Sequence, residues 1–354
     1  MKYLKNPARL RYLVPAILIL ILSGCGSSEK EKVFEQAESD MEQGSYSYAL
    51  AGYEASVANG TNEALSWRGI GLCHLRLGEP ETAVSDLTMA LSYEDNSRTL
   101  QKDILTYRAQ ANIKAGRMEE ALSDCQTLTG MVEADADVYF LTGEAALGLD
   151  SYEEAMTNFE QSLQADPSYD RAIQIYGVYV ENGMEADGSR FLEKILSVPA
   201  KTAQEHCDRG RVCYYMEDYD QAWSELIEAQ KGGVPEAASL LGMVYMARED
   251  YSNARAMFTQ YNSRSENSAK GYNGLALCDM AEKNYAAALS DIQQGIAVAS
   301  PDDLQSLMFN EVVIYERMLD FPTALAKAQE YMEIFPDDTR MEREVTFLRS
   351  RVQS

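Results

Sequence analysis

One spacing recurs along almost the whole of this 354-residue chain. About every 34 residues the chain has a small residue in the same setting. The residue three positions before it has a larger side chain, and the residue four positions after it is apolar. The nine small residues are Ala49, Ala83, Ala121, Ala155, Gly188, Ala222, Ala254, Ala288 and Ala324. A period of this length is typical of proteins built by stacking one structural unit on the next. We therefore expect a repeat architecture.

Glycines inside and between the expected helices indicate how such a unit packs. Gly71 and Gly143 fall within helical patterns, where glycine costs about 1 kcal/mol relative to alanine. Their recurrence indicates that a neighbouring element passes close by. Gly78, Gly116 and Gly183 stand where a first helix must turn into a second one, as expected of helix C-caps.

The repeat resembles the tetratricopeptide repeat family, whose unit is a pair of antiparallel helices. The first-helix residues that carry the resemblance are Trp67, Ile70, Gly71 and His74, then Tyr139, Thr142, Gly143 and Ala146, then Ala238, Leu241, Gly242 and Tyr245. The second-helix residues are Ala83 with Leu87, Ala155 with Phe159, and Ala254 with Phe258, and Pro167 and Pro336 end units. The resemblance implies an all-α, TPR-type α-solenoid: a right-handed superhelix of about nine helical hairpins over residues 31–338.

Two segments depart from the regular unit. Residues 169–196 have Tyr176 and Gly177 in exchanged order, which leaves the register of that unit open by one residue. Residues 339–354 carry an apolar stripe on a helix otherwise rich in Arg and Glu, which predicts a C-terminal capping helix. The stripe is Met341, Val345, Leu348 and Val352.

The N-terminus has the pattern of a targeting segment. Four basic residues precede the apolar run 13–22, which as a helix would extend only about 15 Å and is too short to span a bilayer. We therefore expect a signal peptide over residues 1–24. The sequence Leu22-Ser23-Gly24-Cys25 resembles the lipobox of bacterial lipoproteins, which implies a diacylglycerol on Cys25 and acyl chains such as palmitate. Residues 25–30 would then be the lipidated cysteine and a short tether. An ordinary secretory signal with an incidental cysteine is the alternative.

Charge and cysteine usage exclude several classes of protein. With 31 basic and 56 acidic residues the formal net charge is −25, which disfavours nucleic acid as a partner. The five cysteines beyond Cys25 are odd in number and form no CxxC pair, so we expect neither a disulfide framework nor a metal site. On a helix His206 and Cys207 point to different sides, so His206, Cys207 and Cys213 are interpreted as core residues and not as a metal cluster. No cofactor is expected.

An enzyme is the rival class, and the sequence disfavours it. The chain has no GxSxG, Walker, HExxH or GxGxxG motif, and only His74 and His206 could act as imidazole bases. His74 stands where the repeat usually has a packing residue, so a structural role is favoured.

The resemblance implies a function in binding, because stacked hairpins of this family commonly hold peptide or protein segments on the concave side lined by first helices. Projection of the repeat gives an inner face that also includes Leu72, Phe140 and Glu144. The candidate contacts are Arg68, Arg76, Arg211, Tyr214, Tyr215, Met243, Met246, Asn273 and Met280.

The sequence therefore predicts a scaffold for a protein or peptide partner, anchored to the cell membrane by the lipid on Cys25 on its extracytoplasmic side. A lipoprotein that recognises a cell-wall glycan or peptide is the alternative function, since exposed aromatic rings would also stack on sugars.

Overall fold

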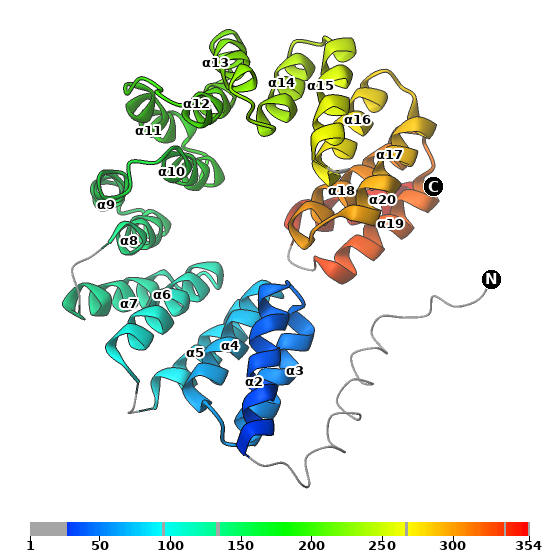
Figure 1. Cartoon of the computed structure of the whole chain (residues 1–354). Helices are drawn as coiled ribbons and strands as arrows, with labels where there is room; N and C mark the ends of the chain where they lie inside the picture. The colour runs from blue at the N-terminus through cyan, green and yellow to red at the C-terminus, as the bar shows by residue number, and fades with distance from the viewer. Residues whose placement is uncertain (1–26, 94–95, 132–134, 266–267, 336–337, 353–354) are drawn as a thin grey trace. The chain divides into compact units, whose positions relative to one another are not determined.

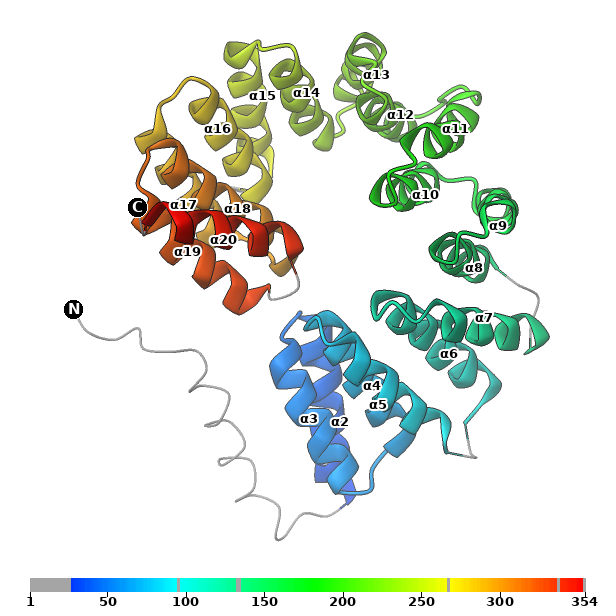
Figure 2. The same cartoon turned by 180° about the vertical axis from the view of Figure 1, so that it is seen from behind.

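Helical hairpins make up the computed structural model, which describes residues 27–93, 96–131, 135–265, 268–335 and 338–352 (Figures 1 and 2). Within these ranges every regular element is an α-helix. The helices form nine antiparallel pairs, α2–α3 to α18–α19, followed by α20. The prediction of an all-α solenoid is therefore confirmed.

The helices have the following bounds: α2 (Ser27–Glu42), α3 (Tyr46–Ala58), α4 (Glu63–Arg76), α5 (Pro80–Leu91), α6 (Arg98–Lys114), α7 (Met118–Met131), α8 (Ala136–Gly148), α9 (Tyr152–Ala165), α10 (Tyr169–Glu181), α11 (Glu185–Leu196), α12 (Ala203–Tyr215), α13 (Tyr219–Lys231), α14 (Glu236–Ala247), α15 (Tyr251–Arg264), α16 (Ala269–Ala281), α17 (Tyr285–Val298), α18 (Pro301–Arg317), α19 (Phe321–Ile334) and α20 (Thr339–Val352). The chain divides into two units, one ending at Ala165 and one beginning at Asp166.

A glycine or alanine on seven of the nine described first helices makes room for the second helix of the same hairpin. A Cβ added to Gly143 would lie 2.8 Å from Cδ1 of Phe159, and one added to Gly242 would lie 2.6 Å from Cε1 of Phe258. Both aromatic residues belong to the sequence repeat. The position lies twelve residues before each small residue of the second helix and holds Ala37, Gly71, Ala109, Gly143, Tyr176, Gly210, Gly242, Ala276 and Val312.

The hairpin α10–α11 keeps this register, which answers the question left open by the sequence. Tyr176 occupies the first-helix position, and Gly188 on α11 is buried against it. A Cβ on Gly188 would lie 2.8 Å from Cβ of Tyr179, whereas one on Gly177 would have nothing within 4 Å. Gly177 is therefore not the packing glycine.

Every hairpin turns through one residue in the left-handed region, five positions before the small residue of the second helix. The predicted Gly78, Gly116 and Gly183 have φ of 77°, 71° and 72°, as expected for C-cap glycines. The nine residues are Gly44, Gly78, Gly116, Asp150, Gly183, Glu217, Glu249, Lys283 and Leu319.

Within each unit, buried apolar residues join neighbouring hairpins. One cluster contains Ala222 and Leu226 of α13 together with Leu241 and Val244 of α14. The five cysteines of the described residues are all buried, as expected of small apolar side chains. Stability therefore arises from boundaries between neighbouring hairpins as well as from the hairpins themselves.

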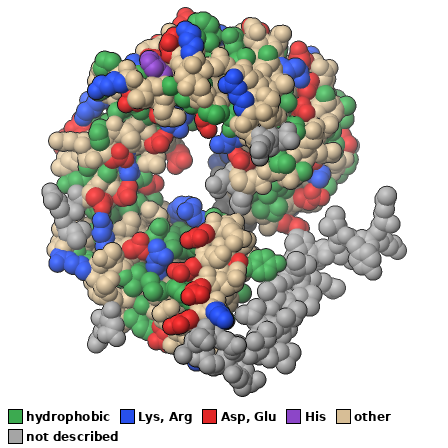
Figure 3. Space-filling view, viewed as in Figure 1, with side chains coloured by type: hydrophobic (Ala, Val, Ile, Leu, Met, Phe, Trp, Pro, Cys, Tyr) green, Lys and Arg blue, Asp and Glu red, His purple; other side chains and the backbone are tan. Residues whose placement is uncertain are grey.

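The helices at the two ends of the array, α20 and α2, have different features. Helix α20 buries Met341, Val345 and Leu348 against α18 and α19, whereas Val352, predicted to belong to the same stripe, is 43% exposed because it lies in the last turn, past that cluster. At the other end α2 exposes a row of carboxylates, visible over the N-terminal hairpin in Figure 3. The row is Glu31, Glu35, Glu38 and Glu42.

The N-terminal predictions fall largely on residues outside those described. The signal peptide 1–24, Cys25 and also Pro336 lie outside the described ranges. Helix α2 begins at Ser27, so residues 27–30, assigned above to a tether, are already helical. The segment that follows is rich in Glu and Lys, which are good helix formers. No helix that the structure describes has both the length and the apolar composition needed to cross a bilayer.

Candidate partner-binding face

The first helices lie side by side along one side of each unit. In the second unit α10 contacts α12, α12 contacts α14, α14 contacts α16 and α16 contacts α18. No contact of similar extent joins successive second helices among the described residues. The hairpins are therefore closer together on the first-helix side, which makes that side the concave one within the unit. The term first-helix face is used below for this side of α10, α12, α14, α16 and α18.

Polar bonds tie neighbouring first helices together across this side. In the second unit the guanidinium of Arg211 on α12 donates to Asp170 on α10, and Asn310 Nδ2 on α18 donates to Asn273 Oδ1 on α16 at 2.7 Å. In the first unit Arg68 on α4 donates to Asp103 on α6. Three predicted contact residues, Arg68, Arg211 and Asn273, thus link repeats.

The predicted tyrosines on α12 lie in different surroundings. The ring of Tyr214 packs 5.8 Å from that of Tyr219 within the apolar core, and burial raises the pKa of the Tyr214 phenol. The ring of Tyr215 is 42% exposed and lies 6.3 Å from the ring of Tyr176 on α10. Of the pair, Tyr215 is therefore the residue available to a partner.

The predicted methionines are mainly packing residues. Met243 and Met246 of α14 contact the buried cluster of Ala254, Phe258 and Cys278, and the Met246 and Cys278 sulfur atoms are 3.4 Å apart. Met280 packs against the cluster that contains Ala276 and Ile292. These side chains fill the space between neighbouring repeats.

Arg76 is the most exposed of the predicted arginines, at the last residue of α4. Leu72 and Phe140 pack against apolar clusters of the first unit, and Glu144 is half-buried and has an interaction partner. Of the predicted inner-face residues of the first unit, Arg76 alone is freely accessible.

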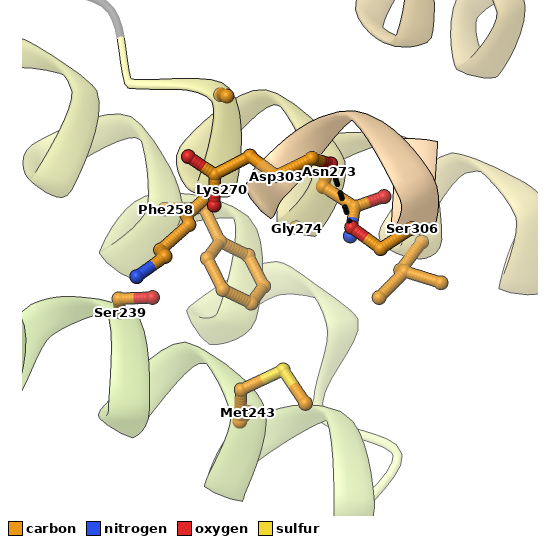
Figure 4. A pocket seen from close by; sticks show the side chains of 10 residues that line it. Ser239, Met243, Phe258, Lys270, Asn273, Gly274, Asp303 and Ser306 are labelled. Carbon is orange, nitrogen blue, oxygen red and sulfur yellow. Dashed lines mark hydrogen bonds between the residues drawn. The ribbon is translucent and has the colours of Figure 1, made fainter. Parts of the chain in front are cut away.

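A cavity of about 190 Å³ opens on the first-helix face between α14, α16 and α18, and is called the α16 cavity below. Figure 4 shows its side chains converging from these helices and from α15. It is lined by Ser239, Met243, Phe258, Ala269, Lys270, Asn273, Gly274, Leu277, Asp303 and Ser306. Met243 and Asn273 are therefore the two predicted contacts that the structure brings together at one hollow.

Gly274 of α16 and the ring of Phe258 meet in the lining of the cavity. Gly274 stands directly over the ring of Phe258, which leaves no room for a side chain at this position. The rim is polar: Lys270 is exposed, and the carboxylate of Asp303 accepts a hydrogen bond from Ser300 Oγ at 2.8 Å. An apolar floor with a few polar groups around it is the usual composition of a binding pocket.

A second, open cavity of about 700 Å³ lies at the ends of α10 and α12 and is called the tyrosine cavity. Its lining includes Tyr176 and Tyr215 but otherwise comes from the turns after these helices and from the start of α11. Sequence projection missed these residues because only the inner positions of first helices were projected. The recurrence of turns at a fixed place in the repeat is the signal that could have found them.

The two histidines are each bonded to a carboxylate of the same hairpin. Nδ1 of His74 lies 2.6 Å from Oδ2 of Asp86, and Nδ1 of His206 lies 2.6 Å from Oε2 of Glu225. The carboxylate raises the pKa of His74, chiefly through this hydrogen bond. Such pairs join the two helices of a hairpin, which agrees with the structural role expected of His74. Within the described residues no group of His, Cys, Asp and Glu side chains has the arrangement of a metal site.

Comparison with known proteins agrees with this architecture. The tetratricopeptide repeat model matches residues 34–98, 106–170 and 239–303, which together make up more than half of the chain. No curated protein matches the sequence.

Several solved structures are similar to this chain. A tetratricopeptide repeat protein from Parabacteroides merdae is 18% identical, with 71% of this chain and 99% of that one covered and a TM-score of 0.42. MamA from Desulfovibrio magneticus is 17% identical over 49% of this chain and 95% of its own, with a TM-score of 0.41. A chain of the APC/C hetero-tetramer Cut9–Hcn1 is 12% identical over 90% of this chain and 76% of its own, with a TM-score of 0.40.

Proteins built from these repeats are in general interaction scaffolds for protein partners rather than catalysts. With nine stacked hairpins in the described residues and a family model that matches most of the repeat region, the chain belongs to the tetratricopeptide repeat family.

Proposed function

We propose that this protein is a lipid-anchored scaffold on the extracytoplasmic side of a bacterial membrane, and that it holds a segment of a partner protein on its first-helix face. The observation that carries the binding role is the α16 cavity, where three successive first helices and the ring of Phe258 surround a hollow with a polar rim. The anchor rests on the sequence of residues 1–25. A diacylglycerol provides two acyl chains, which is enough for stable anchoring.

Partner capture tests the binding role. A photo-crosslinking amino acid at Ser306, on the rim of the α16 cavity, is expected to trap a partner protein in native cells, and Ser239→Trp is expected to abolish the trapping by filling the hollow. Ser263, an exposed residue of α15 away from the cavity, is the matched control position for both changes. Equal trapping from Ser306 and Ser263 would contradict the proposal.

Binding of purified wall fragments tests the alternative function, recognition of a cell-wall glycan or peptide. If the full chain retains these fragments and no protein is crosslinked, glycan or wall-peptide recognition replaces the scaffold role.

Metabolic labelling tests the anchor. Cells given an alkyne-bearing fatty acid are expected to label the wild-type chain and to retain it in the detergent-soluble membrane fraction. The Cys25→Ala variant is expected to lose the label, because the thiol that would carry the lipid is gone. A variant that stays labelled would rule out Cys25 as the attachment site, whatever the outcome of the crosslinking.

A further inference from the structure

The tyrosine cavity is open, and its lining has a distinct chemistry. One wall is the end of α10 with the turn into α11, and the other is the end of α12 with the turn into α13. It contains two aromatic rings, two methionines and three carboxylates, from Tyr176, Met184, Glu185, Asp187, Tyr215, Met216 and Glu217. All of these belong to the second unit. The volume of about 700 Å³ lies within the range of ordinary small-ligand sites.

The two rings provide a surface for a cation. The rings of Tyr176 and Tyr215 contact each other, with centroids 6.3 Å apart and planes inclined by 47°, and both line the cavity. The hydroxyl of Tyr176 donates to Oε1 of Glu185 at 3.1 Å, which holds that ring in place. Aromatic faces attract ammonium and guanidinium groups within about 6 Å of the ring centre.

The carboxylates give the cavity an uncompensated negative charge. Glu185, Asp187 and Glu217 line it, and neither a Lys nor an Arg is among the lining residues. In the described part of the chain none of the three forms a salt bridge. Two of these carboxylates also act on the neighbouring phenol. The pKa of Tyr176 is raised first by burial and further by Glu185 and Glu217. Anionic partners are therefore repelled from this site.

We propose that the tyrosine cavity binds an Arg or Lys side chain carried by a basic segment of a protein partner. The proposal rests on the proposed scaffold function and adds the chemistry of one docking point. The aromatic rings would stack on the cationic group and the carboxylates would accept its hydrogen bonds, with the guanidinium of Arg favoured because it is planar and presents several donors. The cavity is larger than one guanidinium, so the flanking residues of the segment also enter it.

A pair of labelled peptides tests this chemistry on the full chain purified in detergent. The probe is Gly-Arg-Gly-Arg-Gly, and its partner has citrulline in place of arginine, which keeps the shape and removes the charge. Fluorescence anisotropy is expected to show binding of the arginine peptide only, weakened by added salt. Equal binding of the citrulline peptide would overturn the proposal.

Variants locate the site. Tyr215→Leu and Glu217→Gln are each expected to weaken binding of the arginine peptide about three- to tenfold, in line with cation–π and charge-assisted contacts. Tyr215→Phe keeps the ring and is expected to bind as the wild type does. Tyr152→Leu and Glu153→Gln on α9 are the controls, because Tyr152 is 50% exposed beside an exposed Glu153 and neither is among the residues that line the cavity.

The outcomes separate this proposal from the scaffold function. Wild-type affinity in both Tyr215→Leu and Glu217→Gln, with unchanged thermal unfolding, would overturn the cation site while leaving crosslinking from Ser306 unaffected. Loss of crosslinking with an intact arginine-peptide response would instead remove the α16 cavity from the binding face. Competition by a neutral wall oligosaccharide that displaces the arginine peptide would show that the rings stack on sugars, and would also count against the cation site.

Discussion

Tyr176 and Gly188 exchange bulk across the hairpin α10–α11. In most hairpins the first helix contributes a glycine or alanine and the second an alanine, whereas here the first helix carries a tyrosine and the second a glycine. Cδ2 of Tyr176 would lie 3.2 Å from a Cβ on Gly188. The large side chain of Tyr176 is accommodated because Gly188, where the other eight hairpins all have alanine, has no side chain.

The first prediction concerns this contact. Gly188→Ala is expected to lower the free energy of unfolding by about 1–3 kcal/mol, because the new Cβ would overlap Tyr179 and Tyr176 in a packed core. Gly177→Ala is the control: with nothing within 4 Å of its Cβ, it is expected to raise stability by up to about 1 kcal/mol through helix propensity. Urea unfolding followed by far-UV circular dichroism measures both. A stabilised Gly188→Ala would refute the close contact.

The second prediction concerns the turns. Leu319 has φ of 62° and is 73% exposed, so it pays backbone strain without gaining burial. Leu319→Gly is expected to stabilise the C-terminal hairpin by about 1 kcal/mol. Gly78→Ala, at the equivalent turn with φ of 77°, is expected to destabilise its hairpin by a similar amount. Thermal unfolding measures the melting temperature of both variants. Melting temperatures that shift in the same direction would contradict the prediction.

The third prediction is a pH dependence at His74. Its pKa is raised, first by the hydrogen bond to Asp86 and then by the nearby negative charges, and burial opposes the shift. The imidazolium is therefore favoured in the folded state, and its stabilising contribution is complete below the ordinary pKa of 6.5 and is lost as pH rises through the folded pKa.

His74→Gln is expected to lower the urea midpoint most at about pH 6 and least at about pH 9. Asp86→Asn, which removes the partner, is expected to show the same trend. A difference from wild type that grows with rising pH would contradict the assignment.

The fourth prediction concerns the contact between α18 and α20. The pKa of Glu316 is raised to about 7, first by burial and then by hydrogen bonding and charge from the neighbouring Glu344. The folded state therefore binds a proton that the unfolded state releases, so stability rises as pH falls from about 7 towards the ordinary value of 4.5.

Glu316→Gln removes the charge that is unfavourable above about pH 7, and it is expected to raise the unfolding midpoint at about pH 8 and to be neutral at about pH 5. Glu333 is an exposed carboxylate on α19, so Glu333→Gln is the control. It is expected to leave the unfolding midpoint unchanged at both pH values. Loss of stability in Glu316→Gln at the higher pH would show that the ionised carboxylate is bonded productively.

Much of the fold could be predicted from the sequence because packing of each hairpin depends on local, repeated side chains. Gly71, Gly143 and Gly242 face the residue four places after the small residue of the second helix, and this relationship recurs with the period. The exchange at Tyr176 and Gly188 escaped prediction because two departures from the pattern compensate each other only in space.

The contact residues could be predicted only in part. Projection places Met246 and Asn273 on inner positions, but it does not say that Met246 reaches the sulfur of Cys278 or that Asn310 bonds to Asn273. Those contacts depend on side chains one period away and on the spacing of neighbouring first helices. The turn residues Met184 and Glu217 were missed because a helical projection does not include them.

The direct contact between successive first helices also bears on how the second unit responds to an occupant. Each boundary between hairpins is a separate packed layer, so a small rotation at one boundary does not disrupt the layers on either side. Small rotations of this kind at the successive boundaries from α10 to α18 would add up along the unit, much as the coils of a spring share an imposed load. A first-helix face of this kind would change its curvature while every hairpin keeps its own core, and the proposed binding of partner segments of different size would need no unfolding.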